Sequence, residues 1–399
     1  MAEILKGKAV VGQSGGPTAV INQSLVGVIQ EAVGHSQITG LLGARHGVRG
    51  IIKGDFIDLS KVSGKTLEDV AVTPSSALGS TRDKPDEEYC RKMFEVFKQN
   101  DVRYFFYIGG NDSADTANIT NQLAVQSGYE LRVFHIPKTI DNDLRVTDHC
   151  PGYGSAARFV ASAVMGDDLD NRSLPGIKID VIMGRHAGFL TAASVLARTR
   201  EGAGPHLIYV PEVSFDEDKF AADVDRVMKK YNRCVVVVSE GIHFADGTAV
   251  TTKIAKIDEV DGHGNVQLSG TGALGDYLST LVKAKLGQKL RVRADTFGYL
   301  QRSFPGFYSE VDAREARMVG RAAVKCAVQQ NVDGSVAMRR TGEGAKYAVE
   351  TFVTELTSVA RQTKSLDAKY IVDGNDIADS YRDYVAPLVG QLPTTGYLF

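Results

Sequence analysis

Six short runs of apolar residues, rich in valine, isoleucine, tyrosine and phenylalanine, alternate along this chain with longer segments of helical periodicity. Within each run the apolar residues follow one another without polar alternation, which predicts strands buried on both faces, as in a parallel sheet. The alternation with helical segments such as 87–99 and 216–230 predicts an α/β fold with doubly wound, mainly parallel sheets. The runs are 8–11, 103–108, 132–136, 178–182, 206–210 and 234–238.

The length and composition limit the number of domains and the class of protein that the chain can form. The 399 residues suit two or three packed domains rather than one small module. The 41 glycines exceed the usual share of about 7%, but with only 11 prolines the excess fits neither a collagen-like repeat nor a disordered tract. The glycines therefore need a local explanation.

Several classes of protein are disfavoured by charge and cysteine spacing. The net charge of −2 lacks the basic excess of a general nucleic-acid binder. No apolar run approaches the ~20 residues that span a bilayer, and the first residues lack a signal-peptide pattern. The four cysteines are far apart, so neither a disulfide framework nor a zinc site is indicated. We expect a cytoplasmic protein with no nucleic-acid or membrane partner.

Glycines and small or charged polar residues follow five of the six predicted strands. Ligands of open α/β sheets bind outside the carboxyl ends of the strands, so five such ends indicate a binding site. The segments are Gly12–Gly16, Gly109–Ser113, Pro137–Asp143, Met183–Gly188 and Ser239–Gly241.

Two motif matches are disfavoured. Gly64-Lys65-Thr66 resembles the end of a P-loop, but Leu59 stands where that motif requires glycine. The segment Gly12–Gly16 fits the Gly-x-Ser-x-Gly elbow of serine hydrolases, with Ser14 as nucleophile. A glycine-rich turn after a first strand is more typical of a phosphate cradle, because bare backbone N–H groups approach an anion closely.

The remaining strand ends have both a structural and a catalytic interpretation. Gly109–Ser113 suits a turn with a helix cap, or a phosphate and Mg²⁺ site. Pro137–Asp143 suits an Asx-rich turn, or phosphoryl transfer with a carboxylate as base and Lys138 neutralising the phosphoryl group. If the strand continued, Asp141 and Asp143 would share a face. Surface arginines are often only solvated, but Arg185 follows a buried strand and suits phosphate oxygens.

Together these strand ends resemble those of the phosphofructokinase family. The resemblance runs from Gly12 to at least Arg302, and its motifs occur in the family's order. It implies phosphorylation of the 1-hydroxyl of fructose 6-phosphate by two α/β domains flanking a cleft. Residues 1–152 with about 301–370 would form the phosphate-donor domain, and 153–300 with about 371–399 the fructose 6-phosphate domain.

The resemblance also implies a role for each matching residue. Asp141 would be the general base, Arg185 would stabilise the transition state, and Arg293 would reach the 6-phosphate from a neighbouring subunit. The other residues implied at the sugar are Thr139, Asp143, Met183, Gly184, Glu240, Tyr299 and Arg302, and those implied at the donor phosphates are Gly15, Gly16 and Gly110.

The phosphoryl donor is indicated by two positions. ATP-using members of the family have glycine where this chain has Asp112, whose carboxylate would repel and crowd a nucleotide α-phosphate. Lys138 matches a lysine of pyrophosphate-using relatives, and Tyr299 stands where the ATP branch has histidine. Asn111 replaces the usual aspartate ligand of Mg²⁺ and offers a neutral carbonyl oxygen instead.

We therefore expect a pyrophosphate-dependent, Mg²⁺-assisted enzyme of glycolysis that forms fructose 1,6-bisphosphate as a homodimer or higher homo-oligomer. The alternatives are an ATP-dependent 6-phosphofructokinase and, more distantly, a non-catalytic sugar-phosphate sensor on the same fold. Retention of both Asp141 and Arg185 argues against a sensor, which needs neither a base nor a transition-state clamp.

Overall fold

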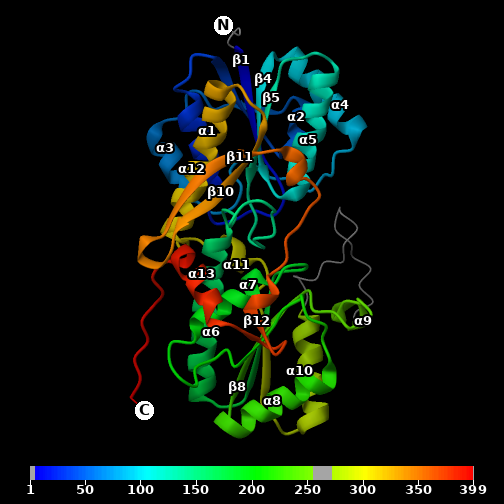
Figure 1. Cartoon of the computed structure of the whole chain (residues 1–399), viewed down its shortest axis with the longest axis vertical. Coiled ribbons are helices and arrows are strands. Elements are labelled where there is room, and N and C mark those ends of the chain that lie inside the picture. Colours follow the sequence, from blue (N-terminus) through cyan, green and yellow to red (C-terminus); the bar gives the residue numbers. More distant parts are fainter. Residues whose placement is uncertain (1–4, 255–271, 399) are drawn as a thin grey trace. The chain divides into compact units, whose positions relative to one another are not determined.

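The computed structural model describes residues 5–254 and 272–398, and the chain folds into two compact units (Figure 1). Unit 1 comprises Met1–Ser155 and Arg302–Lys364, and unit 2 comprises Ala156–Gln301 and Ser365–Phe399. The chain therefore passes between the units three times. Which unit binds the donor and which binds the sugar stays a prediction.

Unit 1 is built on a seven-stranded sheet with the order β11-β10-β5-β4-β1-β2-β3. Its central strands run parallel, and only the two edge strands, β3 and β11, pair antiparallel. The strands are β1 (Gly7–Gln13), β2 (Ile38–Ala44), β3 (Phe56–Asp58), β4 (Val102–Gly109), β5 (Arg132–Pro137), β10 (Gly334–Gly342) and β11 (Ala348–Thr354).

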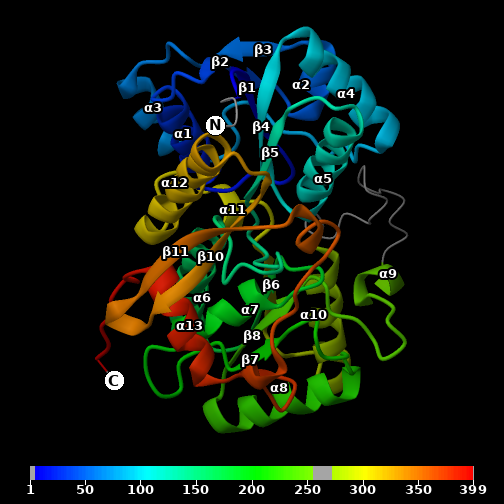
Figure 2. The ribbon, with the colours of Figure 1, turned by 45° about the horizontal axis from the view of Figure 1, so that its top comes forward.

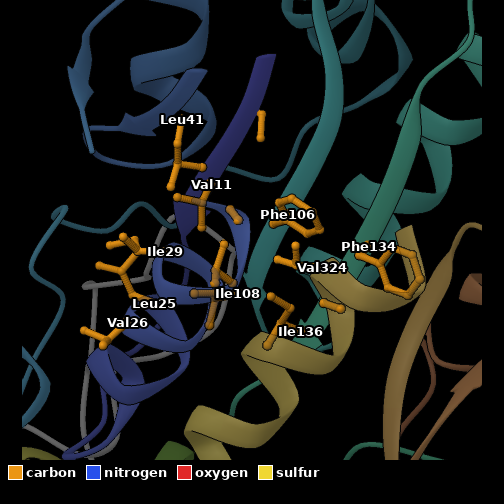
Figure 3. Packing of buried hydrophobic residues seen from close by; sticks show 14 of the residues in the cluster. Val11, Leu25, Val26, Ile29, Leu41, Phe106, Ile108, Phe134, Ile136 and Val324 are labelled. Carbon is orange, nitrogen blue, oxygen red and sulfur yellow. The ribbon is translucent and has the colours of Figure 1, made fainter. Parts of the chain in front are cut away.

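Helices cover both faces of this sheet (Figure 2). Successive residues of one strand are buried on opposite faces of the sheet. Val11 and Phe106 pack in one apolar cluster, and Val10 and Phe105 pack in the other. Figure 3 shows the first cluster, where Leu25 and Val324 come from helices. Burial on both faces explains the unbroken apolar runs. The first face carries α1 (Ile21–Ala32), α3 (Gly64–Ala71) and α12 (Glu310–Lys325), and the second α2 (Val48–Lys53), α4 (Glu87–Gln99) and α5 (Asn111–Gln126).

Part of the glycine excess serves the packing of α1 against α12. A Cβ atom at Gly27 would lie 2.3 Å from the carbonyl oxygen of Arg317, and one at Gly320 would lie 2.2 Å from that of Ser24. Real Cβ atoms do not approach backbone so closely. The two helices therefore touch backbone to backbone because each has a glycine at the crossing.

Unit 2 is built on a four-stranded parallel sheet with the order β7-β8-β6-β9. A small antiparallel pair, β12 and β13, is separate from it. The strands are β6 (Ile177–Ile182), β7 (Leu207–Tyr209), β8 (Cys234–Ser239), β9 (Val292–Thr296), β12 (Ile371–Val372) and β13 (Asp376–Ile377), and the helices are α6 (Tyr153–Ser173), α7 (Phe189–Ala192), α8 (Glu217–Tyr231), α9 (Val250–Ile254), α10 (Ala273–Leu286), α11 (Leu300–Ser303) and α13 (Asp379–Val389).

Short helical turns complete both units. They are η1 (Ala193–Ala197), the π-helical η2 (Cys326–Gln330), η3 (Gly344–Lys346), η4 (Leu356–Ser358) and η5 (Ala368–Tyr370). No helix among residues 5–254 and 272–398 is both long and apolar enough to cross a membrane.

The six predicted strands and the two named helical segments are confirmed, and two expectations need correction. The glycine-rich, polar composition of residues 258–275 predicts an exposed loop; most of it lies outside the described residues, but its last residues, 273–275, begin α10. The prolines and glycines from Ala386 to Phe399 predict an irregular tail, but α13 continues to Val389, so the irregular part starts later. Cysteines 90, 150, 234 and 326 are all free, in line with the absence of a disulfide framework.

Candidate active site

The loops that follow β1, β4 and β5 lie side by side in unit 1, because these three strands are neighbours in the parallel sheet. The backbone N–H of Ser14 donates to the carbonyl of Ile108 at 2.9 Å, and that of Lys138 donates to the carbonyl of Gly109 at 2.9 Å. The Ser113 hydroxyl donates to that of Ser14 at 2.9 Å. Ser14 is thus bonded to another serine, which cannot act as the base that a nucleophilic serine needs.

Four of the predicted residues, Lys138 among them, lie close together. The side chain of Lys138 is only 5% exposed, and its Nζ donates to the carbonyl of Gly16 at 2.6 Å. A Cβ atom at Gly15 would lie 3.2 Å from this Nζ, and one at Gly16 would lie 2.8 Å from Nη1 of Arg302. Gly15, Gly16, Lys138 and Arg302 therefore form one cationic group at the end of β1, which we call the cationic floor.

Burial, together with the neighbouring charge of Arg302, lowers the pKa of Lys138 to about 8, while the charges of Asp141 and Asp143 oppose this shift. Burial and a nearby guanidinium both disfavour a charged ammonium, so additional negative charge would stabilise it. An anionic ligand with several phosphate oxygens would supply that charge.

The turn into α5 presents backbone rather than side chain. Gly110 precedes the helix, and a Cβ atom there would meet nothing closer than the Lys138 carbonyl at 3.8 Å. At Gly109, by contrast, a Cβ atom would lie 2.0 Å from the Ser113 hydroxyl, so that glycine is required by packing. The space beside Gly110 is therefore available to a ligand at the N-terminus of a helix, where anions bind favourably.

Asn111 and Asp112 occupy the first turn of α5. The Oδ1 atom of Asn111 accepts the backbone N–H of Asp112 at 2.9 Å and keeps its second lone pair. The Asp112 carboxylate is about half exposed and lies 3.5 Å from Nζ of Lys84. An amide carbonyl and a carboxylate are hard oxygen donors, so the pair fits Mg²⁺ with further oxygens from phosphate and water.

Among the described residues, one group of three metal-ligating side chains occurs, and it lies elsewhere. It consists of Asp167, Asp180 and Asp295 in unit 2. The ammonium of Lys178 already sits among them, with Nζ 3.2 Å from Asp167 and 3.8 Å from Asp180, and it also pairs with Asp295. This group is an ion-pair network with its own cation.

The segment that carries Asp141 and Asp143 is a turn, which corrects the argument from a continued strand. The strand β5 ends at Pro137, and Asn142 adopts a left-handed conformation with φ of 57°. The Thr139 hydroxyl accepts the backbone N–H of Asp141 at 3.0 Å, and the Asn142 side chain accepts that of Cys150 at 3.0 Å. Burial raises the pKa of Asp143. The turn, rather than alternation along a strand, places the two carboxylates.

In unit 2 the ends of β6 and β8 pack against each other, since the two strands are neighbours. The Ser239 hydroxyl donates to the carbonyl of Gly184, and the backbone N–H of Glu240 donates to that of Ile182 at 2.8 Å. Gly184 has φ of 137°, where side chains are strained. The structure thus brings Met183, Gly184 and Arg185 together with Glu240.

Arg293 lies away from these residues. It is the second residue of β9 and pairs in register with Lys178, near the start of β6. Five residues of strand separate that level from Met183, or roughly 15 Å. Arg293 is exposed and lines a pocket of about 270 Å³ together with Lys178 and Arg291. Tyr299, 42% exposed, follows Gly298 after the end of β9.

The loop 80–84 of unit 1 was not predicted, because only residues that directly follow a strand were considered. The backbone N–H of Gly15 donates to the Thr81 carbonyl at 2.9 Å, and the Ser80 hydroxyl donates to the carbonyl of Gly15 at 2.6 Å. The charge of Arg82 contributes to the low pKa of Lys138, and Lys84 pairs with Asp112. The loop follows no strand, so its two closely spaced cations, Arg82 and Lys84, were the one available signal.

The sequence matches the family described as Phosphofructokinase over residues 8–327. The chain belongs to the phosphofructokinase family. It is 54% identical over 389 residues to the pyrophosphate–fructose 6-phosphate 1-phosphotransferase of Rhodospirillum rubrum, covering 97% of this chain and 95% of the relative. It is 39% identical to the enzyme of the same name from Halomonas elongata, and the match covers 96% of this chain and 91% of the relative.

A solved relative has the same fold. The crystal structure of the pyrophosphate-dependent phosphofructokinase from Nitrosospira multiformis superposes with a TM-score of 0.84 at 35% identity, covering 98% of this chain and 94% of that one. These relatives place the chain in the pyrophosphate-dependent branch of the phosphofructokinase family.

Proposed function

We propose that this phosphofructokinase transfers a phosphoryl group from pyrophosphate to the 1-hydroxyl of fructose 6-phosphate, with Asp141 as the general base. The observation that carries the choice of donor is Asp112 on the first turn of α5, at the position where ATP-using members of the family have glycine. Its carboxylate disfavours a nucleotide α-phosphate by charge and by size, whereas pyrophosphate ends before that point.

The cationic floor suits the donor. The two phosphates of pyrophosphate carry several negative charges, and Lys138 beside Gly15 and Gly16 would neutralise part of them. The open backbone at Gly110 lets a phosphate reach the positive end of α5. When bound, Mg²⁺ would neutralise phosphate charge, held by the oxygens of Asn111 and Asp112 together with phosphate and water.

Asp141 would take the proton from the 1-hydroxyl as its oxygen bonds to phosphorus. The bond to the bridging oxygen of pyrophosphate breaks, and inorganic phosphate leaves. The Thr139 hydroxyl fixes the backbone of Asp141, and so helps to aim its carboxylate. Lys138 and Arg185 would stabilise charge on the phosphoryl group, while Asp143, Met183, Gly184, Glu240 and Tyr299 would bind the sugar.

Arg293 supports a homo-oligomeric enzyme. Arg293 lies level with the start of β6, and this separates it from Arg185 of its own chain. Its side chain is exposed and accessible to another subunit. We propose that it binds the 6-phosphate in the neighbouring subunit, together with that subunit's own Arg302. A dimer is the smallest assembly in which this exchange completes both sites. The phosphorylated metabolites that it uses suit a cytoplasmic enzyme of glycolysis.

Replacing Asp112 tests the donor assignment. Asp112→Gly should allow ATP to support turnover, because it removes the carboxylate from the space of the α-phosphate, although Lys138 still disfavours the longer donor. The control Asp115→Gly makes the same change one turn later on α5, where the carboxylate pairs with Arg361 instead. If Asp112→Gly shows no binding of ATP by calorimetry, the exclusion by Asp112 is wrong.

A further inference from the structure

The segment from Thr139 to Gly152, between β5 and α6, doubles back on itself. Its outgoing limb, 139–143, carries Asp141 and Asp143, and its return limb, 149–152, lies against the outgoing one. The backbone N–H of Thr139 donates to the carbonyl of Pro151 at 3.2 Å, and that of Cys150 donates to Asn142 at 3.0 Å. A displacement of the return limb would therefore move both carboxylates.

His149, at the start of the return limb, is 1% exposed and lies between two carboxylates. Its Nδ1 is 2.7 Å from Oδ2 of Asp148, and its Nε2 is 2.7 Å from Oε2 of Glu315 on α12. Ionised carboxylates only accept hydrogen bonds, so both ring nitrogens donate when the two partners are charged. The geometry is that of an imidazolium that joins the return limb to α12.

The two carboxylates are themselves held in place. The other oxygen of Glu315 accepts the Tyr347 hydroxyl at 2.7 Å. Asp148 also accepts from the guanidinium of Arg340, at 3.2 Å and 3.3 Å. The histidine is thus the central member of a network that includes Glu315 of α12, Arg340 of β10 and Tyr347 of the turn between β10 and β11.

The same helix holds the end of the return limb one turn earlier. Asp312 of α12 is 2% exposed, and it accepts the backbone N–H groups of Gly152 and Ser155 at 2.8 Å each. Two buried carboxylates of α12, Asp312 and Glu315, therefore fix the return limb at two points. Asp312 accepts hydrogen bonds from backbone N–H groups at this end, whereas Glu315 binds the side chain of His149.

We propose that His149 is a positioning residue for phosphoryl transfer, whose imidazolium ties the return limb to α12 and so fixes Asp141 and Asp143. The inference rests on the proposed role of Asp141 as base. It assigns His149 no contact with substrate and no proton transfer in the reaction.

The charge of His149 gives this role a pH dependence. Burial lowers its pKa, but the hydrogen bonds and charges of Asp148 and Glu315 outweigh burial, and the net shift is upward. Arg340, Tyr347 and Asp312 also face the network, and the ammonium of Lys364 donates to the carbonyl of Asp148 at 2.8 Å. A raised folded-state pKa means that the stabilisation is complete below the pKa of the unfolded chain and is lost as the pH rises through the folded one.

The test measures kcat, KM and thermal unfolding for His149→Gln in the full-length enzyme. Glutamine keeps a donor but loses the charge and the second bond. We expect kcat to fall by about 10- to 100-fold, as for a slightly misplaced reacting group, while KM for pyrophosphate changes less than threefold. The double variant His149→Gln with Glu315→Gln should recover part of kcat, since two amides can bond without charge.

A milder variant and a spectroscopic measurement cover the case in which His149→Gln does not fold. Tyr347→Phe removes one hydrogen bond to Glu315 and should lower kcat a few-fold with the fold intact. Nitrogen NMR of the wild type at pH 7 should show both ring nitrogens of His149 protonated. A neutral His149, or a folded His149→Gln enzyme with unchanged kcat, would overturn the proposal.

If Asp141 were not the general base, the measured rates would differ from those expected if only the role of His149 were wrong. Asp141→Ser should abolish most turnover in both the wild-type and the His149→Gln backgrounds. If Asp141→Ser were fully active, the proposed base would be wrong whatever His149 does. If Asp141→Ser were inactive and His149→Gln fully active, only the positioning role would fail.

Discussion

Lys138 shows how one buried charge links the fold to the choice of donor. Burial and the charge of Arg302 lower its pKa to about 8, so the ammonium is present at neutral pH and is lost on the alkaline side. A bound polyanion would hold the proton on Lys138. Binding of pyrophosphate should therefore weaken when the free enzyme loses this proton.

KM for pyrophosphate should rise as the pH passes about 8, because an uncharged Lys138 no longer attracts phosphate oxygens. Steady-state kinetics between pH 6.5 and about 9.5 measure this change. Lys138→Arg is the control, since arginine stays charged throughout this range. An identical pH dependence of KM in the wild type and in Lys138→Arg would contradict the assignment.

Asp141→Ser should reduce kcat by roughly 10²- to 10⁴-fold while KM for fructose 6-phosphate changes little, because the variant loses proton transfer and keeps the binding groups. Initial rates together with circular dichroism measure the effect on a folded enzyme. Asp69→Ser, an exposed position on α3, is the matched control and should be fully active. A comparable loss in both variants would point to general destabilisation instead.

The residues found from sequence are those whose chemistry is concentrated in a short segment. Lys138, Asp141 and Asp143 lie within six positions, directly after a recognisable strand. Lys84 and His149 could not be found in this way, because their partners Asp112 and Glu315 are distant in sequence. Their significance depends on tertiary neighbours that no local pattern encodes.

At the scale of elements, two glycines test different functions: Gly110 precedes α5, and Gly27 lies within α1. Gly110→Ala should leave folding intact, because a Cβ atom there meets nothing within 3.4 Å, but it should weaken pyrophosphate binding by filling the space at the start of α5. Gly27→Ala should instead destabilise the fold and leave pyrophosphate binding unchanged, since its Cβ atom would lie 2.3 Å from the carbonyl of Arg317 on α12.

Thermal unfolding and KM for pyrophosphate separate these two outcomes. Gly27→Ala should cost about 1–3 kcal/mol of stability, as overpacking commonly does, with KM near that of the wild type. If Gly110→Ala bound pyrophosphate normally, the donor would not approach the backbone at α5. If Gly27→Ala were as stable as the wild type, the helices would have room to separate.

The predicted strands are the fully buried ones, and the missed strands have weaker patterns. β2 contains two glycines and a threonine, and β9 contains an arginine and an aspartate, and both strands are only partly buried. β10 and β11 carry charged residues at their exposed positions. Exposed positions accept polar side chains, so the apolar signal fades, whereas the fully buried edge strand β7 keeps it.

At the scale of the whole molecule, Arg293 predicts complementation between subunits. Asp141→Ser and Arg293→Ala chains should each be nearly inactive alone. In a mixed dimer, one site would have both an intact Asp141 and an intact Arg293, so random pairing should restore roughly a quarter of the wild-type activity. Co-expression with two affinity tags isolates the mixed dimers, which should have roughly half of the wild-type activity because one of their two sites is intact. No activity above the parents would show that Arg293 serves its own chain's site.

The family and both sheets could be predicted because the motifs recur at strand ends in a fixed order. The subunit arrangement could not, because an interface depends on the shape of a surface rather than on the spacing of residues. The proposed role of Arg293 at an interface rests on the family resemblance and on its position on β9, far from the end of β6.

The central claim is that this phosphofructokinase uses pyrophosphate because Asp112 and Lys138 shape the donor site. The most direct measurement compares kcat/KM for pyrophosphate and for ATP, with fructose 6-phosphate and Mg²⁺ saturating in both assays. We predict efficient turnover with pyrophosphate and little or none with ATP. A kcat/KM for ATP equal to or above that for pyrophosphate would contradict the account.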